Sequence, residues 1–177
     1  MSDCESPQLT GLAPLLDERC RVLVLGSFPG AASLAAQAYY GHLQNQFWRI
    51  LTDILPFPAG LVVTSSYQER SKCLLGQGVG LWDVYAACER QGSLDANIRH
   101  AQLNDLASLK QRCPQLQAIV HNGGESYKHR RHTEALGLPV HRLPSTSPAN
   151  ASVPYERKRE EWRVVLGMYL KLKPDLP

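Results

Sequence analysis

Four short apolar runs constrain the fold more than any other feature of this sequence. They are Arg21–Gly26 (RVLVLG), Val79–Val84 (VGLWDV), Gln117–His121 (QAIVH) and Val140–Leu143, and each has the length and composition of a buried strand. Helix-compatible segments alternate with them, at residues 31–40, 46–55, 68–75, 104–112, 125–136 and 154–172. This alternation predicts a doubly wound α/β fold: a three-layer α/β/α sandwich with a central, mainly parallel four-stranded sheet.

We expect a single domain spanning residues 1–177, because this length suits one hydrophobic core and no repeat or long linker divides the chain. The polar, Pro-containing residues 1–18 are expected to form a flexible N-terminal segment. Asn104 has the side-chain chemistry to cap the helix predicted at residues 104–112.

Composition excludes several classes of protein. Hydrophobic residues make up 44% and charged residues 20% of the chain, which argues against intrinsic disorder. No apolar run approaches the roughly 18–20 residues that span a bilayer, and Met1–Thr10 lacks the basic start of a secretory signal. The formal charge of +3 permits a polyanionic partner without requiring one.

The cysteines predict no metal site and no disulfide framework. The chain has 5 of them, an odd number, at Cys4, Cys20, Cys73, Cys88 and Cys113. No Cys-x-x-Cys pair occurs, and no cysteine lies near a histidine at zinc-ligand spacing. We therefore expect buried, reduced cysteines and a cytoplasmic protein, associated with the nucleoid if the chain is bacterial.

Unusual polar clusters follow all four predicted strands. They are Gly26–Gly30 (GSFPG), Asp83, Asn122–Gly124 (NGG) and Pro144–Asn150 (PSTSPAN). Because ligands of parallel α/β sheets bind beyond the carboxyl ends of the strands, these clusters predict one shared crevice. The first cluster is also compatible with a plain strand–helix turn, and it matches neither the Gly-Lys-[Ser/Thr] nor the Gly-x-G-x-x-Gly phosphate-binding pattern.

The segment Tyr39–Trp48 (YYGHLQNQFW) concentrates aromatic and amide side chains just before a predicted helix. Asn45 is suited to cap that helix, and the rings are suited to the core. Flat rings beside an amide also suit a pocket that stacks a planar base. The hydroxyls of Pro144–Asn150 are good phosphate ligands, and basic clusters at residues 128–132 and 157–163 modestly favour a nucleic acid partner.

Taken in order, these motifs are recognisable. GSFPG, YYGHLQNQFW, GLWDVYAACERQGSLDANI, HNG and LPSTSPAN together resemble the uracil-DNA glycosylase superfamily, and within it the hypoxanthine-DNA (deoxyinosine) glycosylase branch. The similarity runs from about Arg21 to Asn150. The resemblance implies a uracil-DNA glycosylase-like fold and a monofunctional hydrolase that flips a deaminated base, hypoxanthine or uracil, out of DNA and cleaves its N-glycosidic bond in base excision repair.

The resemblance also implies roles for individual residues. Many members carry a water-activating residue in the loop after the first strand, where this chain has Ser27 and Phe28, and the role passes to Asn45 in the hypoxanthine branch. The histidine of the second uracil motif is replaced by Leu143, and the base-reading amide corresponds to Asp83, a carboxylate that accepts hydrogen bonds. Base-binding candidates are Gly26, Ser27, Phe28, Phe47 and Asp83, and DNA phosphate-binding candidates are Pro29, Gly30, Ser145, Thr146, Ser147 and Asn150.

The implied enzyme needs no metal and no organic cofactor, and no lysine in the motifs suggests a Schiff base. Its partner is DNA containing deaminated bases, no membrane is involved, and a monomer is expected. The segment Ala149–Tyr155 is the expected wedge for the gap that a flipped nucleotide leaves, with Val153, Tyr155 and the alanines as equal candidates. Three alternatives stay open: a uracil or G·U mismatch glycosylase, a non-catalytic binder of damaged DNA or free bases, and a hydrolase of free nucleosides or nucleotides.

Overall fold

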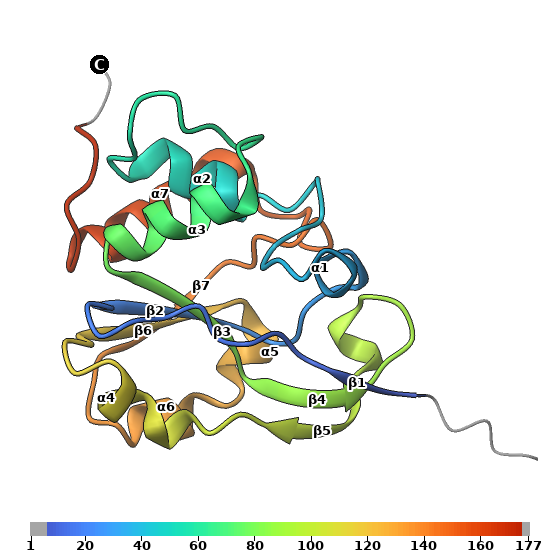
Figure 1. Ribbon diagram of the computed structural model, residues 1–177. Coiled ribbons are helices and arrows are strands. Elements are labelled where there is room, and N and C mark those ends of the chain that lie inside the picture. Colours follow the sequence, from blue (N-terminus) through green and yellow to red (C-terminus); the bar gives the residue numbers. More distant parts are fainter. Residues whose placement is uncertain (1–6, 175–177) are drawn as a thin grey trace, which may run out of the picture.

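The computed structural model describes residues 7–174, and its centre is a four-stranded parallel sheet (Figure 1). The strands lie in the order β3 (Val79–Asp83), β2 (Val22–Gly26), β6 (Ala118–Asn122) and β7 (Val140–Leu143). Val24 pairs with Leu81 on one side and with Val120 on the other, and every pairing is parallel. The predicted parallel sheet is confirmed. Its order reverses at β2, which has β3 on one side and β6 on the other, and such a switch point opens a crevice at the carboxyl ends of the strands.

Helices cover both faces of this sheet (Figure 1). On one face lie α2 (Phe47–Ile54), α3 (Tyr67–Gly76) and α7 (Tyr155–Gly167), and on the other lie α4 (Leu109–Arg112) and α6 (Arg130–Glu134). Alternate side chains of β2 supply the two cores: Val22 and Val24 pack in one, and Leu23 and Leu25 in the other. The predicted three-layer architecture is therefore confirmed.

Short elements connect these layers, namely α1 (Ala31–Ala36), η1 (Asp95–Asn97), η2 (Leu106–Ser108) and α5 (Gly124–Tyr127). The helix predicted at residues 125–136 is interrupted between α5 and α6. The cap predicted for Asn104 is wrong, because its Nδ2 donates to the Asp83 carbonyl oxygen at 2.8 Å and the following helical turn begins only at Leu106. Asn104 thus fixes the end of β3 instead of the start of a helix.

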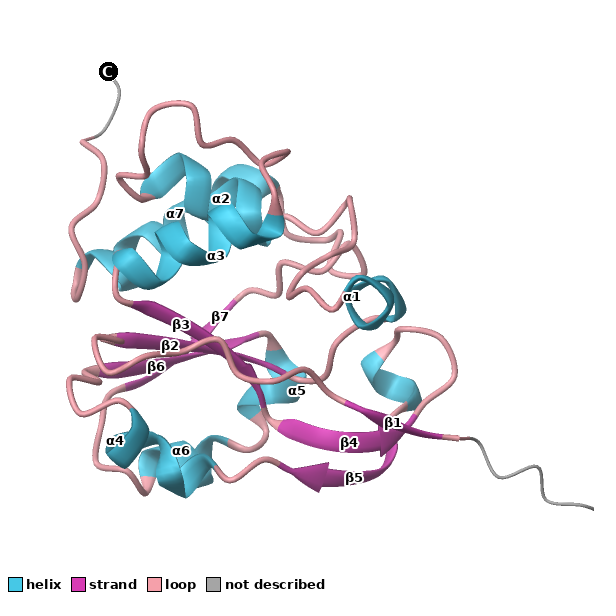
Figure 2. Cartoon of the chain, in the orientation of Figure 1, coloured by secondary structure: helices cyan, strands magenta, loops and turns pink. Residues whose placement is uncertain are grey.

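A second, antiparallel sheet lies beside the first and was not predicted (Figure 2). Its strands are β1 (Gln8–Thr10), β4 (Tyr85–Glu89) and β5 (Arg99–Leu103), in the order β1–β4–β5. All of β5 is exposed, so its sequence carries no alternation of buried and exposed positions. The connection from β4 to β5 is long and includes residues 91–98.

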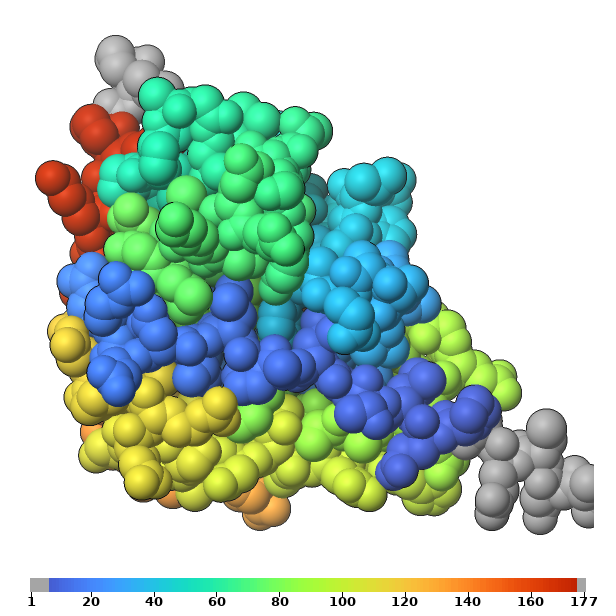
Figure 3. Space-filling model, in the orientation of Figure 1, coloured from blue at the N-terminus to red at the C-terminus, as the bar shows by residue number. Residues whose placement is uncertain are grey.

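The N-terminal segment corrects another prediction. Residues 7–18 were expected to be flexible, but β1 pairs with β4, and Leu15 exchanges backbone hydrogen bonds of 2.9 and 2.7 Å with Leu81. Leu12 is buried. Figure 3 shows the segment, in dark blue, running as a band across this face of the molecule. The prediction is wrong for residues 7–18 because their leucines reach the core, and residues 1–6 lie outside the described residues.

Four cysteines lie within the described residues, and all are free thiols: Cys20, Cys88 and Cys113 are buried and Cys73 is half-buried. The expected burial is confirmed for three of these positions and is incomplete for Cys73, while Cys4 lies outside the described residues. No helix between residues 7 and 174 has both the length and the apolar character needed to cross a membrane.

Candidate functional site

A cavity of about 590 Å³ opens at the carboxyl ends of the four parallel strands. Gly26 of β2, Asp83 of β3, Asn122 of β6 and Ser145 after β7 all line it. The volume falls within the range of about 300–1,000 Å³ that is typical of small-molecule pockets. The crevice predicted from the four strand ends therefore exists.

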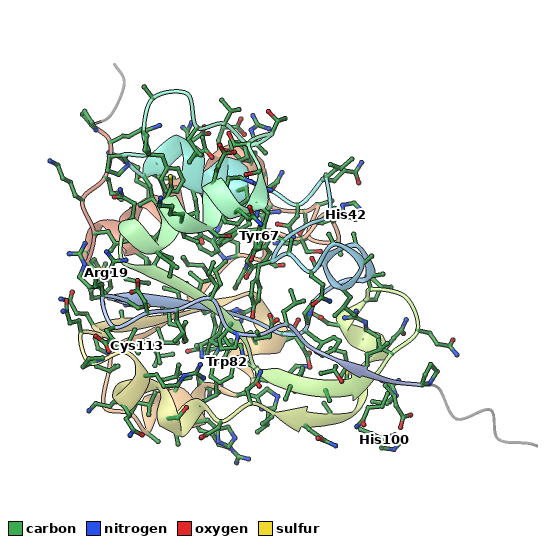
Figure 4. The ribbon with its side chains drawn as sticks, viewed as in Figure 1. Arg19, His42, Tyr67, Trp82, His100 and Cys113 are labelled. Carbon is green, nitrogen blue, oxygen red and sulfur yellow. The ribbon has the colours of Figure 1, made fainter. Side chains whose placement is uncertain are left out.

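The lining has two parts that differ in exposure. We call the floor the buried and half-buried residues at its base, Gly26, Tyr40, Asn45, Asp83 and Asn122, and the rim the exposed lining residues His42, Ser93, Leu94, Asp95, Pro148 and Ala149. In Figure 4, His42 marks the cavity end of the molecule, and Arg19 and Cys113 lie at the opposite end of the sheet. The floor is built on the strands and the start of α2, whereas the rim is built on connecting loops.

Asn45 lies on the floor, in the turn just before α2. Its Oδ1 accepts a hydrogen bond from the backbone N–H of Phe47 at 3.0 Å, and its own N–H donates to the His42 carbonyl at 2.9 Å. Because a backbone N–H can only donate, the atom that faces Phe47 must be the amide oxygen. That oxygen keeps a second lone pair, and Nδ2 has no hydrogen-bond partner among the described residues. The pocket interpretation of Asn45 agrees with this geometry, whereas the capping interpretation is wrong, because the N-cap of α2 is Gln46 and the Asn45 side chain closes the turn just before the helix.

Asp83 is the most deeply buried ionisable group on the floor, with 4% of its surface exposed. Its Oδ2 is buried and has no hydrogen-bond partner within residues 7–174. Burial, with a further contribution from the negative charge of Asp95, raises the pKa of Asp83 to about 7, although the Arg90 guanidinium opposes this rise. At neutral pH the side chain is therefore divided between carboxylate and carboxylic acid, and the acid form can donate as well as accept a hydrogen bond.

Gly26 is required beneath this carboxyl. A Cβ atom on Gly26 would lie only 2.4 Å from Oδ1 of Asp83 and 3.4 Å from the hydroxyl of Tyr40. Any larger residue would therefore displace Asp83 from the floor. This is a physical reason for glycine at the first position of GSFPG.

The aromatic residues are arranged differently from the prediction. Phe28 lines the cavity, but Phe47 does not: its ring is fully buried and stacks on Tyr40 with centroids 3.9 Å apart. The proposed stacking of Phe47 on a base is wrong, because Phe47 lies on the helical face that enters the core against Trp48 and Trp162. Tyr40, which stacks on Phe47, is the ring that lines the cavity here.

Tyr40 has an unusual backbone conformation. Its φ is 56°, in the left-handed region that bulky residues rarely adopt, and its hydroxyl is buried without a hydrogen-bond partner among the described residues. Such strain persists only where the surrounding structure holds it, and it is concentrated at functional sites. Nothing in the local sequence signals this conformation, although Tyr40 belongs to the aromatic segment singled out above.

Thr146 does not face solvent. It is fully buried, its N–H donates to Oδ1 of Asn122 at 3.0 Å, and its Oγ1 accepts from Nδ2 of Asn122 at 3.0 Å. Its carbonyl accepts from the N–H of Gln46 at 3.0 Å. The predicted phosphate contact through the Thr146 hydroxyl is therefore wrong. This residue instead joins the loop after β7 to β6 and to the turn before α2.

Ser145 and Ser147 line the cavity with hydroxyl protons available. Oγ of Ser145 accepts from the N–H of Ser147 at 3.2 Å, and Oγ of Ser147 accepts from the N–H of Ala149 at 3.2 Å. Since each oxygen is already an acceptor, each hydroxyl proton is free to donate to an anion. Asn150 also lines the cavity, but its Nδ2 donates to the Ser145 carbonyl at 3.1 Å and shapes the loop.

The loop that contains Ser93, Leu94 and Asp95 also lines the cavity, and its sequence did not predict this position. Ser27 Oγ donates to Oδ1 of Asp95 at 2.7 Å, and Nη2 of Arg90 donates to the carbonyl of buried Pro29 at 2.5 Å. Gly30 and Pro29 line the cavity from beneath this loop. The sequence GSLDAN is rich in the turn-forming residues Gly, Ser, Asp and Asn, so it gave no signal beyond its place in the family resemblance.

The basic clusters lie outside the cavity. Lys128, His129, Arg130, Arg131 and Glu134 line a second hollow of about 250 Å³. Lys128 pairs with Glu125 and Arg130 with Glu134, so part of this charge is neutralised within the protein. Within residues 7–174, no three His, Cys, Asp or Glu side chains are grouped closely enough to hold a metal ion.

The chain is similar to one protein family and to proteins of two Methanosarcina species. A family model described as the Uracil DNA glycosylase superfamily matches residues 13–171. A hypoxanthine DNA glycosylase of Methanosarcina barkeri is 36% identical over 140 residues, which cover 79% of this chain and 87% of that protein. A hypoxanthine DNA glycosylase of Methanosarcina acetivorans is 34% identical over 156 residues, which cover 88% of this chain and 96% of that protein.

A solved structure shows the same fold. The solution NMR structure of a Methanosarcina acetivorans protein assigned as a uracil DNA glycosylase superposes with a TM-score of 0.77 at 32% sequence identity. The match covers 90% of this chain and 96% of that one. The residues matched by the family model, 13–171, include every residue that lines the cavity.

Proposed function

The chain belongs to the uracil DNA glycosylase superfamily, and we propose that it removes hypoxanthine from deoxyinosine in DNA by hydrolysing the N-glycosidic bond. It is a DNA glycosylase acting on deaminated bases. The observation that carries the choice of site is the presence of Asn45 and Asp83 in the floor of one cavity at the strand ends.

Asp83 is proposed to recognise the edge of the flipped base. Hypoxanthine presents the N1–H donor next to the O6 acceptor. In its neutral form the Asp83 carboxyl complements both groups, since its C=O accepts from N1–H and its O–H donates to O6. The burial of Asp83 and its unpartnered Oδ2 support this role. Phe28 and Tyr40, two of the aromatic residues that line the cavity, are the proposed stacking surfaces.

Asn45 is proposed to orient the attacking water. Its Oδ1 has a lone pair left after accepting from the Phe47 N–H, and this lone pair can accept a hydrogen bond from water. An amide cannot remove a proton from water, so the reaction depends on a good leaving group. As the bond to C1′ breaks, negative charge grows on the base, and the hydrogen bond from the neutral Asp83 carboxyl to O6 stabilises that charge.

The hydroxyls of Ser145 and Ser147 are proposed to donate to backbone phosphates of the DNA. These contacts carry no sequence information, but they fix the strand so that the damaged nucleotide stands over the cavity. Pro29, Gly30 and the Asn150 side chain shape the same surface.

The test is to incubate the protein with duplexes that contain inosine, uracil, xanthine or thymine, and to measure alkali-sensitive abasic sites. We expect abasic sites at inosine, formed without strand cleavage before the alkali step. Tight binding to inosine DNA with no abasic product would instead identify a non-catalytic binder. Turnover of free deoxyinosine at the rate of DNA would identify a nucleoside hydrolase.

Uracil is the second candidate substrate. Its N3–H lies beside O4 and forms the same donor–acceptor edge as N1–H and O6 of hypoxanthine, so the Asp83 carboxyl complements both bases. Faster release of uracil than of hypoxanthine in the same assay would change the preferred substrate and leave the site assignment intact.

A further inference from the structure

Two exposed leucines lie beside the cavity. The large hydrophobic side chains exposed within residues 7–174 are Leu43, Val62, Val63, Leu94, Leu103, Val164 and Met168. Leu94 is 55% exposed and lines the cavity at its rim, whereas Leu43 is fully exposed in the turn between His42 and Asn45. A single exposed leucine is ordinary on a protein surface, so exposure alone assigns no role.

The residues on either side of Leu94 are bonded to two other segments of the chain, whereas the turn that carries Leu43 is closed by hydrogen bonds to its own His42. Ser93 Oγ accepts from the backbone N–H of Ala31 at 2.9 Å, and Asp95 Oδ1 accepts from Ser27 Oγ at 2.7 Å. The residues on both sides of Leu94 are thus bonded to the start of α1 and to the loop after β2. The protein holds an uncovered apolar side chain at a fixed position on the mouth of the cavity.

Arg90 also holds the segment 91–98 in position. It is 6% exposed, its Nε donates to the Gly92 carbonyl at 2.9 Å, and its Nη2 donates to the Pro29 carbonyl at 2.5 Å. Its guanidinium carbon also lies 5.1 Å from the centre of the Phe28 ring. A buried arginine with two carbonyl partners ties the segment 91–98 to the loop after β2.

The expected wedge segment, residues 149–155, offers no comparable side chain. Its cavity-lining residues are Ala149 and Asn150, which are small or polar. Its two large apolar side chains, Val153 and Tyr155, do not line the cavity. The Tyr155 hydroxyl donates to Oδ2 of Asp53 at 2.6 Å, which holds its ring against α2.

We propose that Leu94 inserts into the DNA base stack and fills the space left by the flipped nucleotide. This inference rests on the proposed function, because it requires that a base enter the cavity from a duplex. Extruding a base leaves an unstacked gap, and an apolar side chain that occupies the gap lowers the cost of holding the duplex open. Leu94 is apolar, fixed in position and adjacent to the cavity that would receive the base.

The test compares Leu94→Ala on two substrates of identical sequence, an inosine-containing duplex and the same inosine strand alone. A single strand has no stack to fill, so a wedge contributes only on the duplex. We expect kcat/KM of the variant to fall about tenfold on the duplex and to change less than twofold on the single strand. Leu94→Met, which keeps an apolar side chain of similar length, should retain the duplex activity.

Two control variants accompany it. Val164→Ala truncates an exposed apolar residue on α7 outside the cavity lining and should leave both activities unchanged. Leu43→Ala tests the other exposed leucine. A duplex-specific loss in Leu43→Ala, with none in Leu94→Ala, would overturn the proposal and make Leu43 the wedge.

A fluorescence measurement of binding tests the insertion of Leu94 into the base stack without depending on turnover. With 2-aminopurine next to the inosine, we expect wild-type protein to raise the fluorescence as the stack opens and Leu94→Ala to give a smaller rise. Equal rises, or equal losses of activity on both substrates, would contradict the wedge. Failure of the wild-type protein to act on inosine in either substrate would contradict the proposed function instead.

Discussion

The floor and the rim of the cavity are built in opposite ways. Floor residues such as Asp83 and Asn122 end buried strands, and the pairing of those strands fixes their positions. Rim residues such as Leu94 and Ala149 are exposed and lie on loops whose shape comes from side-chain hydrogen bonds. The difference indicates a division of labour: the floor supplies the chemistry on a base, and the rim supplies contacts that depend on the form of the DNA.

This comparison makes a general prediction about substitutions. A change in the floor should reduce base release from every DNA substrate, because the base meets the same residues however it arrives. A change in the rim should act on binding or on duplex opening alone. The following variants test this contrast, beginning with the largest expected effect.

Asn45→Ala should cause the largest loss. Without the amide that orients water, single-turnover release of hypoxanthine should fall by roughly 100-fold or more on duplex and single strand alike. Asn45→Asp is the matched control, since its carboxylate keeps an acceptor for the Phe47 N–H and retains the turn before α2. A loss confined to the duplex would show that Asn45 acts as a rim residue.

Asp83→Asn should change the pH profile. Burial raises the pKa of Asp83 to about 7, so the neutral acid predominates below pH 7 and is lost as the pH rises. Wild-type kcat/KM on inosine should therefore be about tenfold lower at pH 8 than on its low-pH plateau. An asparagine always offers one donor and one acceptor, so the variant should show no such fall. If wild-type activity rises through pH 7, the carboxylate is the active form.

Thr146→Val breaks the connection between the floor and the loop 145–150. It removes the hydroxyl that accepts from Nδ2 of Asn122 and leaves this half-buried donor without its partner. We expect the free energy of unfolding to fall by about 1–3 kcal/mol, measured by urea denaturation. KM should rise on both substrates because the loop loses its fixed position, and an unchanged unfolding curve would show that the connection is unimportant.

Ser147→Ala should have the smallest effect. It removes one hydroxyl donor to phosphate and should weaken DNA binding about two- to tenfold, measured by fluorescence anisotropy. Because phosphates carry no sequence information, the loss should be equal for inosine DNA and undamaged DNA. A loss restricted to inosine DNA would assign Ser147 to the floor.

The same contrast explains what could be predicted from the sequence. The parallel strands are buried on both faces, so their apolar runs indicate both their positions and their ends, and Asp83 and Asn122 follow from those ends. The sequence could not indicate that β4 and β5 form a second sheet, because β5 is wholly exposed and its residues show no periodic burial. For that reason the bracing of Leu94 was not predicted.

The direction in which each side chain points was the second feature that could not be predicted from the sequence. Phe47 is buried in the core and does not line the cavity, and Thr146 lines the cavity but is fully buried and bonded to Asn122. Their directions depend on α2 packing against Trp162 and on the paired hydrogen bonds to Asn122, which are contacts between segments far apart in the chain. Local sequence patterns identify which segments meet at a site but not which of their side chains face it.

The most direct test of the central claim is a crystal structure of the protein with a duplex containing 2′-fluoro-2′-deoxyinosine, whose fluorine slows cleavage of the glycosidic bond. We predict hypoxanthine in the cavity, with its N1–H and O6 edge on the Asp83 carboxyl and a water held by Oδ1 of Asn45 next to C1′. An inosine that remains stacked in the duplex, or a base bound where Asn45 and Asp83 do not touch it or its water, would contradict the account.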